Sequence, residues 1–165
     1  IFVVVGDYGT ILTSSDGTTW TSRTSGTTRT LYGVTYENSI FVVVGDYGTI
    51  LTSSDGTTWT SRTSGTTRTL YGVTYENSIF VVVGDYGTIL TSSDGTSWTS
   101  RDSDTTRNFY GVSYGNNTFV AVGTGGTIRT SSDGIGIQDT DNESRYYWNT
   151  RASGTSNTLY GVTSR

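Results

Sequence analysis

A segment of 39 residues occurs twice in succession without a change, and this repetition restricts the fold more than any other feature of the sequence. Phe2–Ile40 and Phe41–Ile79 are identical, Phe80–Thr118 differs at nine positions, and a more diverged fourth copy begins at Phe119. Each unit must therefore be able to pack against a near-copy of itself, which favours a solenoid or a closed ring. We treat residues 1–165 as a single domain of four repeats.

The fourth copy contains an insertion. Each unit has one tryptophan, and these are Trp20, Trp59, Trp98 and Trp148. The first three are spaced 39 residues apart, whereas the last step is 50 residues, so this copy holds 11 additional residues. We place them in the segment 135–147, the one region that breaks the internal symmetry.

Each unit is predicted to form four short strands. In the second unit these are Leu31–Tyr36, Phe41–Gly45, Thr49–Ser53 and Thr58–Arg62, with breaks rich in Gly, Asp, Asn and Ser between them. The Phe-Val-Val-Val run suits an inner strand that is buried on both faces, and the polar last strand suits an outer edge. Four strands in about 40 residues are typical of one blade of a β-propeller, so we predict an all-β propeller of four blades.

The two ends of the chain are predicted to complete one blade together. Phe2–Gly6 corresponds to a second strand and Leu159–Thr163 to a first strand. Pairing of these two segments would close a four-bladed ring. Two other arrangements stay open, namely one half of an eight-bladed dimer and a fragment of a longer propeller.

A Ser-Ser-Asp-Gly phrase recurs once in each unit and predicts the hairpin between the third and fourth strands. An Asp side chain can accept hydrogen bonds from the backbone of its own turn, and Gly supplies a positive φ. The tryptophan that follows is expected to pack between blades. The residues assigned this structural role are Asp16, Trp20, Asp55, Trp59, Asp94, Trp98, Asp133 and Trp148.

The phrase "SSDGTTW" resembles the Asp-box, or bacterial neuraminidase repeat, with one residue fewer between Asp16 and Trp20. The wider unit, from "LYGVTYENS" to "TSRTSG", is similar to the blades of photosystem II stability/assembly factor-like propellers. The resemblance covers nearly the whole chain and implies a β-propeller. Such repeats occur in sialidases, glycanases, lectin-like domains and assembly factors, so the resemblance implies the fold more specifically than the function.

Composition excludes several classes of function. The net charge of −4 and the absence of Lys disfavour a nucleic-acid binder, which needs a basic face. No Cys or His is present, so thiolate chemistry and the usual general base and zinc ligand are missing. No apolar run approaches the roughly 20 residues of a membrane span. We predict no cofactor, no membrane insertion and no catalytic residue.

A candidate binding face follows from how loops sort in a propeller. The loops between second and third strands share one face, the top, with the connections between blades. The predicted ligand-binding residues on this face are Asp7, Tyr8, Arg29, Asp46, Tyr47, Arg68, Asp85, Tyr86 and Arg107. Tyr rings can stack on sugars, and Arg can bind a carboxylate through a fork of two hydrogen bonds. The structural alternative is that Asp and Arg pair with each other and Tyr covers the blade junction.

Two further sets of residues are weighed as minor candidates. Arg23, Arg62, Arg101 and Arg151 follow each Trp by three residues and are expected at a solvated outer edge or in a cation–π contact. Asp139, Asp141 and Glu143 alternate in the insertion and present oxygen atoms that suit a hard cation such as calcium. The alternative there is a polar extension of a hairpin, with no metal bound.

The sequence thus favours a non-catalytic binding or scaffold propeller. Its partner is a protein or a carbohydrate, and the chain is a monomer or a homodimer. One alternative is lectin-like binding on the top face. A sialidase-like or glycanase-like enzyme is less favoured because Glu37 and Glu76 fall in hairpins on the opposite face. Another alternative is an engineered or reconstructed propeller without an evolved ligand. A Ser/Thr-rich, thiol-free composition favours an extracellular or cell-surface location.

Overall fold

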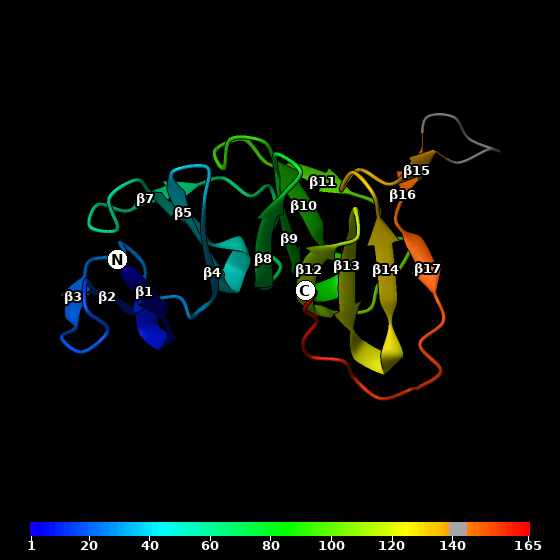
Figure 1. Ribbon diagram of the computed structural model, residues 1–165, viewed down its shortest axis with the longest axis horizontal. Coiled ribbons are helices and arrows are strands. Elements are labelled where there is room, and N and C mark those ends of the chain that lie inside the picture. The colour runs from blue at the N-terminus through cyan, green and yellow to red at the C-terminus, as the bar shows by residue number, and fades with distance from the viewer. Residues whose placement is uncertain (139–144) are drawn as a thin grey trace.

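A computed structural model describes residues 1–138 and 145–165 as a row of antiparallel sheets (Figure 1). Blade 1 contains β1 (Phe2–Val5), β2 (Ile11–Ser14) and β3 (Thr21–Arg23). Blade 2 contains β4 (Leu31–Glu37), β5 (Ile40–Gly45), β6 (Ile50–Ser53) and β7 (Thr60–Arg62). Blade 3 contains β8 (Leu70–Glu76), β9 (Ile79–Gly84), β10 (Ile89–Ser92) and β11 (Thr99–Arg101). Blade 4 contains β12 (Phe109–Gly115), β13 (Thr118–Gly123), β14 (Ile128–Ser131) and β17 (Asn149–Arg151).

The remaining elements are short. Single 3₁₀ turns join the second and third strands of each blade, namely η1 (Asp7–Gly9), η2 (Asp46–Gly48), η3 (Asp85–Gly87) and η4 (Thr124–Gly126). The insertion contributes a small hairpin of β15 (Ile137–Gln138) and β16 (Tyr146–Tyr147). Within the described ranges, no helix has the length and apolar character needed to cross a membrane.

The predicted propeller blades are confirmed. In blade 2 the four strands lie in the order β4-β5-β6-β7, and their bounds agree with the predicted ones to within two residues. The apolar strand β5 is buried along Phe41–Gly45, whereas the polar strand β7 lies at the exposed edge. A strand that is apolar on both sides needs a neighbouring blade on each face, and this requirement organises the whole molecule.

The hydrophobic core lies between blades. Val42 and Val44 of blade 2 pack against Phe80 and Val82 of blade 3, and equivalent clusters fill the other two junctions. Successive inner strands also lie side by side, since β8 contacts both β4 and β12. Figure 1 shows the result as an arc, with the N-terminus at one end beside β1.

The predicted closure of the ring by the two chain ends is not what the structure shows. Blade 1 is a three-stranded sheet with β1 at its edge, and Leu159–Thr163 has no strand assignment. This segment lies against β12 instead, where the Tyr160 ring is 5.3 Å from that of Tyr110. The physical reason is the angle between blades. The junctions set a shallow curve that keeps the C-terminal segment beside blade 4, with β4 and β8 between it and β1 in Figure 1.

The Ser-Ser-Asp-Gly turns form as predicted. Asp55 Oδ1 accepts hydrogen bonds from the backbone N–H groups of Thr57 (2.7 Å) and Thr58 (2.8 Å) and from the Ser53 hydroxyl (2.9 Å). Gly56 follows with φ 70°. The backbone N–H of Thr58 is the largest cause that lowers the pKa of Asp55 to about 2. The same contacts hold the pKa of Asp16 and Asp94 below the usual range.

Because the pKa of these carboxylates is lowered, we predict that the protein loses stability in acid. A lowered pKa in the folded state stabilises the protein above the unfolded-state pKa of about 4, and this contribution is lost as the pH falls toward 2. We expect Asp55→Asn to weaken this dependence, as measured by urea unfolding at a series of pH values. The control is Glu37→Gln, which removes a carboxylate from another hairpin. An Asp55→Asn protein with the acid sensitivity of the parent would contradict the prediction.

The tryptophans lie in the junctions between blades, as predicted, but to different depths. Trp148 is fully buried, Trp59 and Trp98 are half-buried, and Trp20 is 39% exposed because no blade lies in front of blade 1. Contacts with the Phe of the same blade, with ring centres 6.1 to 6.3 Å apart, are made by Trp59, Trp98 and Trp148. Burial therefore follows the presence of a neighbouring blade.

The insertion is attached to blade 3 by charge. The Arg145 guanidinium binds the carboxylates of Asp102 (2.8 Å) and Asp104 (3.0 Å). The backbone N–H of Trp148 also donates to the Asp102 carbonyl of blade 3 (3.0 Å). The candidate calcium ligands Asp139, Asp141 and Glu143 lie outside the described residues. Among the residues described, no group of three His, Cys, Asp or Glu side chains is placed to hold a metal ion.

Candidate functional site: the Tyr–Arg face

The η turns form one face of the arc together with the connections between blades. In blade 2, the backbone N–H of Asp46 donates to the Thr30 carbonyl (2.9 Å), and the N–H of Gly48 donates to the Arg68 carbonyl (2.9 Å). The connections approach so closely that a Cβ on Gly48 would collide with the Thr66 carbonyl oxygen. These contacts fix the loop and leave the side chain at its tip, Tyr47, pointing outward.

The tip tyrosines have an unfavourable backbone conformation. Tyr8, Tyr47 and Tyr86 have φ angles of 54° to 56°, in the left-handed region that favours glycine. For a residue with a side chain this conformation costs roughly 1–2 kcal/mol. Their side chains are also 60% to 86% exposed, so burial gives little in return. A strained and exposed aromatic residue points to a role in binding.

Arginine side chains cover two of these rings. The guanidinium carbon of Arg29 lies 4.0 Å from the ring centre of Tyr47, and that of Arg68 lies 3.9 Å from Tyr86. The sequence analysis grouped Arg29 with Tyr8 of the same copy, but Arg29 stacks on Tyr47 of the next copy. No described Arg stacks on Tyr8. We call these residues, with Tyr8 and Arg107, the Tyr–Arg row.

The structural alternative for this face is wrong in both parts. In the described residues the ion pairs are those of Arg145, so Arg29, Arg68 and Arg107 are not paired with Asp7, Asp46 or Asp85. The tyrosines are exposed and do not cover the junctions. In blade 4 the row changes, because Gly125 stands where the others have Tyr, and the Arg107 guanidinium occupies the space that a side chain at 125 would need.

Two of the three aspartates of this face, Asp46 and Asp85, point inward, whereas Asp7 in blade 1 is exposed. Asp46 Oδ1 accepts a hydrogen bond from the Thr69 hydroxyl (3.2 Å). Burial, together with the nearby Asp85 carboxylate, raises the pKa of Tyr71 to about 12. Burial and Asp46 raise the pKa of Tyr32 in the same way. Asp46 and Asp85 thus belong to the inner side of the arc, while the Tyr–Arg row faces solvent.

Sequence reasoning missed a ladder of inner tyrosines. Tyr32, Tyr71, Tyr110 and Tyr160 stack in sequence along the inner strands, with ring centres 5.1 to 5.3 Å apart. The signal was present, since the dipeptide Leu-Tyr or Phe-Tyr begins every first strand. The ladder gives the inner side of the arc a continuous aromatic surface.

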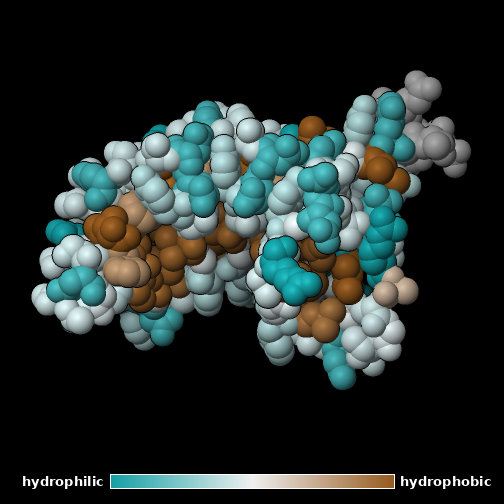
Figure 2. Space-filling view, viewed as in Figure 1, coloured by the Kyte–Doolittle hydropathy of each residue, from teal (hydrophilic) through white to brown (hydrophobic). Residues whose placement is uncertain are grey.

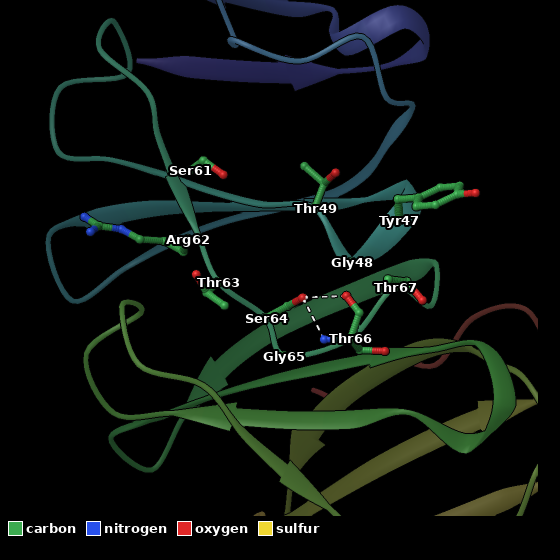
Figure 3. Close-up of a pocket in the computed structure, with 10 residues that line it drawn as sticks. All are labelled: Tyr47, Gly48, Thr49, Ser61, Arg62, Thr63, Ser64, Gly65, Thr66 and Thr67. Carbon is green, nitrogen blue, oxygen red and sulfur yellow. Dashed lines mark hydrogen bonds between the residues drawn. The ribbon is translucent and has the colours of Figure 1, made fainter.

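A shallow groove of about 700 Å³ runs beside Tyr47 (Figure 3). Its lining consists mainly of hydroxyl groups, from Thr49, Ser61, Thr63, Ser64, Thr66 and Thr67. Tyr47 and Arg62 lie at its opposite ends in Figure 3. Similar grooves of about 660 and 510 Å³ lie beside Tyr8 and Gly125. The face therefore offers repeated polar grooves, each at the foot of a loop tip.

Five further arginines have structural roles, four of them at equivalent positions of the blades. Arg23, Arg62, Arg101 and Arg151 each donate through Nε to a Thr hydroxyl on the neighbouring strand, at 2.8 to 3.0 Å. Arg129, which the sequence analysis did not single out, stands where other blades have Leu. It is 8% exposed and donates to the carbonyls of Ser103 (2.7 Å) and Asp104 (3.0 Å).

Comparison with known proteins finds solved structures that have a similar fold. One solved structure, described as YCF48 bound to D1 peptide, superimposes with a TM-score of 0.68 over 98% of this chain, at 18% sequence identity. A second, YCF48 from Cyanidioschyzon merolae, gives a TM-score of 0.56 over 73% of this chain, at 20% identity. The chain spans about half of the first protein, 52%, and 36% of the second. The fold is thus that of the YCF48 propellers. No family model matches the sequence, and no curated protein matches it.

Proposed function

We propose that this chain is a non-catalytic binding module whose Tyr–Arg row holds an extended segment of a partner protein. The observation that carries the proposal is the stacking of Arg29 on Tyr47 and of Arg68 on Tyr86. A stacked guanidinium keeps its N–H edge free, so it can donate to carboxylates or backbone carbonyls. The ring holds the Arg in place, which reduces the entropy lost on binding.

The spacing of the row favours an elongated ligand. Tyr recurs at the loop tips of blades 1 to 3, and Arg recurs in the three connections that lead to blades 2, 3 and 4, so one face presents similar groups several times. A chain of repeating units that carries acidic or carbonyl groups can use these contacts in succession, and each additional contact strengthens binding. The peptide in the solved structure of YCF48 supports this class of ligand, by likeness of fold alone.

A second candidate ligand is a carbohydrate. The hydroxyl-lined groove beside Tyr47 favours it, because exposed aromatic rings and short polar side chains suit sugar faces and hydroxyls. The Arg side chains favour the protein ligand, since a neutral sugar does not need a cation. An acidic peptide and a neutral glycan therefore differ in their requirement for the Arg residues.

The test combines two screens with a matched pair of variants. The purified chain is applied to an array of peptides with free carboxylates and to a glycan array. The affinity of the best ligand is then measured by fluorescence anisotropy for R29Q/R68Q/R107Q and for the control R23Q/R62Q/R101Q. Both variants lose three positive charges, but the control changes arginines of the outer strands.

We expect a peptide ligand whose affinity falls at least about tenfold in the first variant, because charge-assisted hydrogen bonds are lost. A peptide held by the row is expected to bind the control within about twofold of the parent, because Arg62 lies at the end of the groove away from Tyr47 (Figure 3). Equal losses in the two variants would show that net charge alone controls binding and would contradict the proposal. Binding on the glycan array with no binding on the peptide array would favour a carbohydrate ligand.

A further inference from the structure

The groove beside Gly125 in blade 4 differs in charge from the grooves of blades 1 and 2. It has a volume of about 510 Å³ and is lined by three arginines, which are Arg107, Arg129 and Arg151. The grooves beside Tyr8 and Tyr47 are each lined by a single arginine. No Asp or Glu of the described residues lines any of these three grooves. The blade 4 groove therefore carries an excess of positive charge.

Two departures from the repeat produce this excess. Gly125 stands where the first three blades have tyrosine, so Arg107 has no ring to cover, and its guanidinium lies in the space beside the Gly125 backbone. Arg129 stands where blade 2 has Leu51, and it is only 8% exposed. The first change opens the groove to a guanidinium, and the second adds a cation where the other blades have an apolar side chain.

The positive charge of Arg129 is buried without a carboxylate bound to it. Its Nε and Nη2 atoms donate to the backbone carbonyls of Ser103 (2.7 Å) and Asp104 (3.0 Å), which fix the side chain. The nearby Asp104 carboxylate is bound by Arg145 at 3.0 Å. Burial lowers the pKa of Arg129, and the Asp104 charge opposes this effect. Because a buried cation without a bound anion is unfavourable, the site favours the entry of an anion.

The other two arginines have N–H groups that remain available to a ligand. Arg151 donates through Nε to the Thr130 hydroxyl (3.0 Å), and its terminal nitrogens bond to no described residue. The Arg107 guanidinium forms neither an ion pair nor a hydrogen bond with a described residue. Thr150 and Ser156 add hydroxyl groups to the lining. Figure 2 shows hydrophilic surface over β17, the strand that carries Arg151.

We propose that the groove beside Gly125 binds a phosphate group. A phosphate monoester carries roughly two negative charges at neutral pH and has three strong acceptor oxygens, which suit several guanidinium and hydroxyl donors at once. A carboxylate has one charge and two oxygens, so it uses fewer of these donors. Arg107 also belongs to the Tyr–Arg row, but phosphate alone can occupy the groove, so the site stands apart from the proposed peptide ligand.

The test is a calorimetric titration of the purified chain with sodium phosphate in about 0.1 M sodium chloride, where charges more than roughly 10 Å apart are largely screened. We expect saturable binding that becomes at least about tenfold weaker in the R107Q/R151Q variant, which loses charge-assisted hydrogen bonds. Both side chains are exposed, so this variant is expected to fold. The control R23Q/R62Q loses the same charge from the outer strands of blades 1 and 2 and is expected to bind within about twofold of the parent.

Arg129 provides an independent check. The R129L variant has the residue that the other three blades have at this position, so it is expected to fold, and its phosphate binding is expected to weaken at least about tenfold. Thermal unfolding monitors the fold of each variant. A parent protein that does not bind phosphate, or a control that loses as much affinity as R107Q/R151Q, would overturn the proposal.

Two further titrations define the ligand. Sodium acetate is expected to bind at least about tenfold more weakly than phosphate, and equal binding of the two anions would contradict the assignment to a phosphate group. Phosphoserine distinguishes the sources of the group. Tighter binding of phosphoserine than of inorganic phosphate indicates a phosphorylated residue of a partner, whereas weaker binding indicates the free anion, and both results support a phosphate site.

Discussion

Replacing Gly48 with alanine is expected to lower the free energy of unfolding by about 3 kcal/mol or more, through backbone strain of 1–2 kcal/mol and overpacking of 1–3 kcal/mol. Gly48 has φ 67°, and a Cβ there would collide with the carbonyl oxygen of Thr66 and lie 2.7 Å from the Ser64 hydroxyl. The carbonyl belongs to backbone, so the neighbour has little freedom to move. The measurement is chemical unfolding followed by tryptophan fluorescence.

The matched control is Gly65→Ala. Gly65 has φ 76°, but nothing lies within 4 Å of the position of its Cβ. It therefore carries the strain without the collision, and a loss of only about 1–2 kcal/mol is expected. The difference between the two variants measures the close approach of the connection to the η2 turn. Equal losses would mean that the loop relaxes and that the approach does not hold the Tyr–Arg face in place.

Replacing Trp148 with alanine is expected to cost about 3–5 kcal/mol, which is the range for deleting a large aromatic side chain from a core. Trp148 is fully buried, its indole N–H donates to the Gly134 carbonyl (3.1 Å), and its ring contacts Phe119. The loss combines the transfer of the indole to water, the cavity that remains and an unpaired carbonyl. Thermal and urea unfolding of the purified variant would measure it.

Trp98→Ala separates burial from the other contacts. Trp98 makes the same hydrogen bond, to Gly95 at 3.2 Å, and its ring lies 6.3 Å from that of Phe80, the distance found between Trp148 and Phe119. It is only half-buried, so a smaller loss of about 2 kcal/mol is expected. If Trp98→Ala were as costly as Trp148→Ala, the depth of burial would not be the cause.

The blades could be predicted because each one is encoded by a short sequence pattern that the chain repeats. The apolar run at Phe41–Gly45, the turn at Asp55 and the polar strand at Thr60–Arg62 each carry their own signal. The angle between blades carries no such signal. It results from the fit of many side chains across β4, β8 and β12, so the pairing of Leu159–Thr163 with a strand of the same chain could not be tested by pattern.

The candidate face was predictable in location but not in its contacts. Loop order places Tyr47 and Asp46 together on the top face, yet it does not say which way each side chain turns. Asp46 turns inward because hydroxyl donors lie there, and Arg29 turns to the ring of the next copy because the connection between blades brings it there. Arg129 was missed because a single Leu-to-Arg change within a repeat gives no indication of which carbonyls it will contact.

Because the repeats that form the junctions are identical, one whole repeat can be lost or gained without a change in the packing between blades. Removing or adding one segment such as Phe41–Ile79 leaves every remaining junction with the same residues on both sides. The same event removes or adds one Tyr and one Arg on the exposed face. If the proposed function holds, the number of blades sets the length of ligand that the face can contact, and each added blade uses packing that already exists in the molecule.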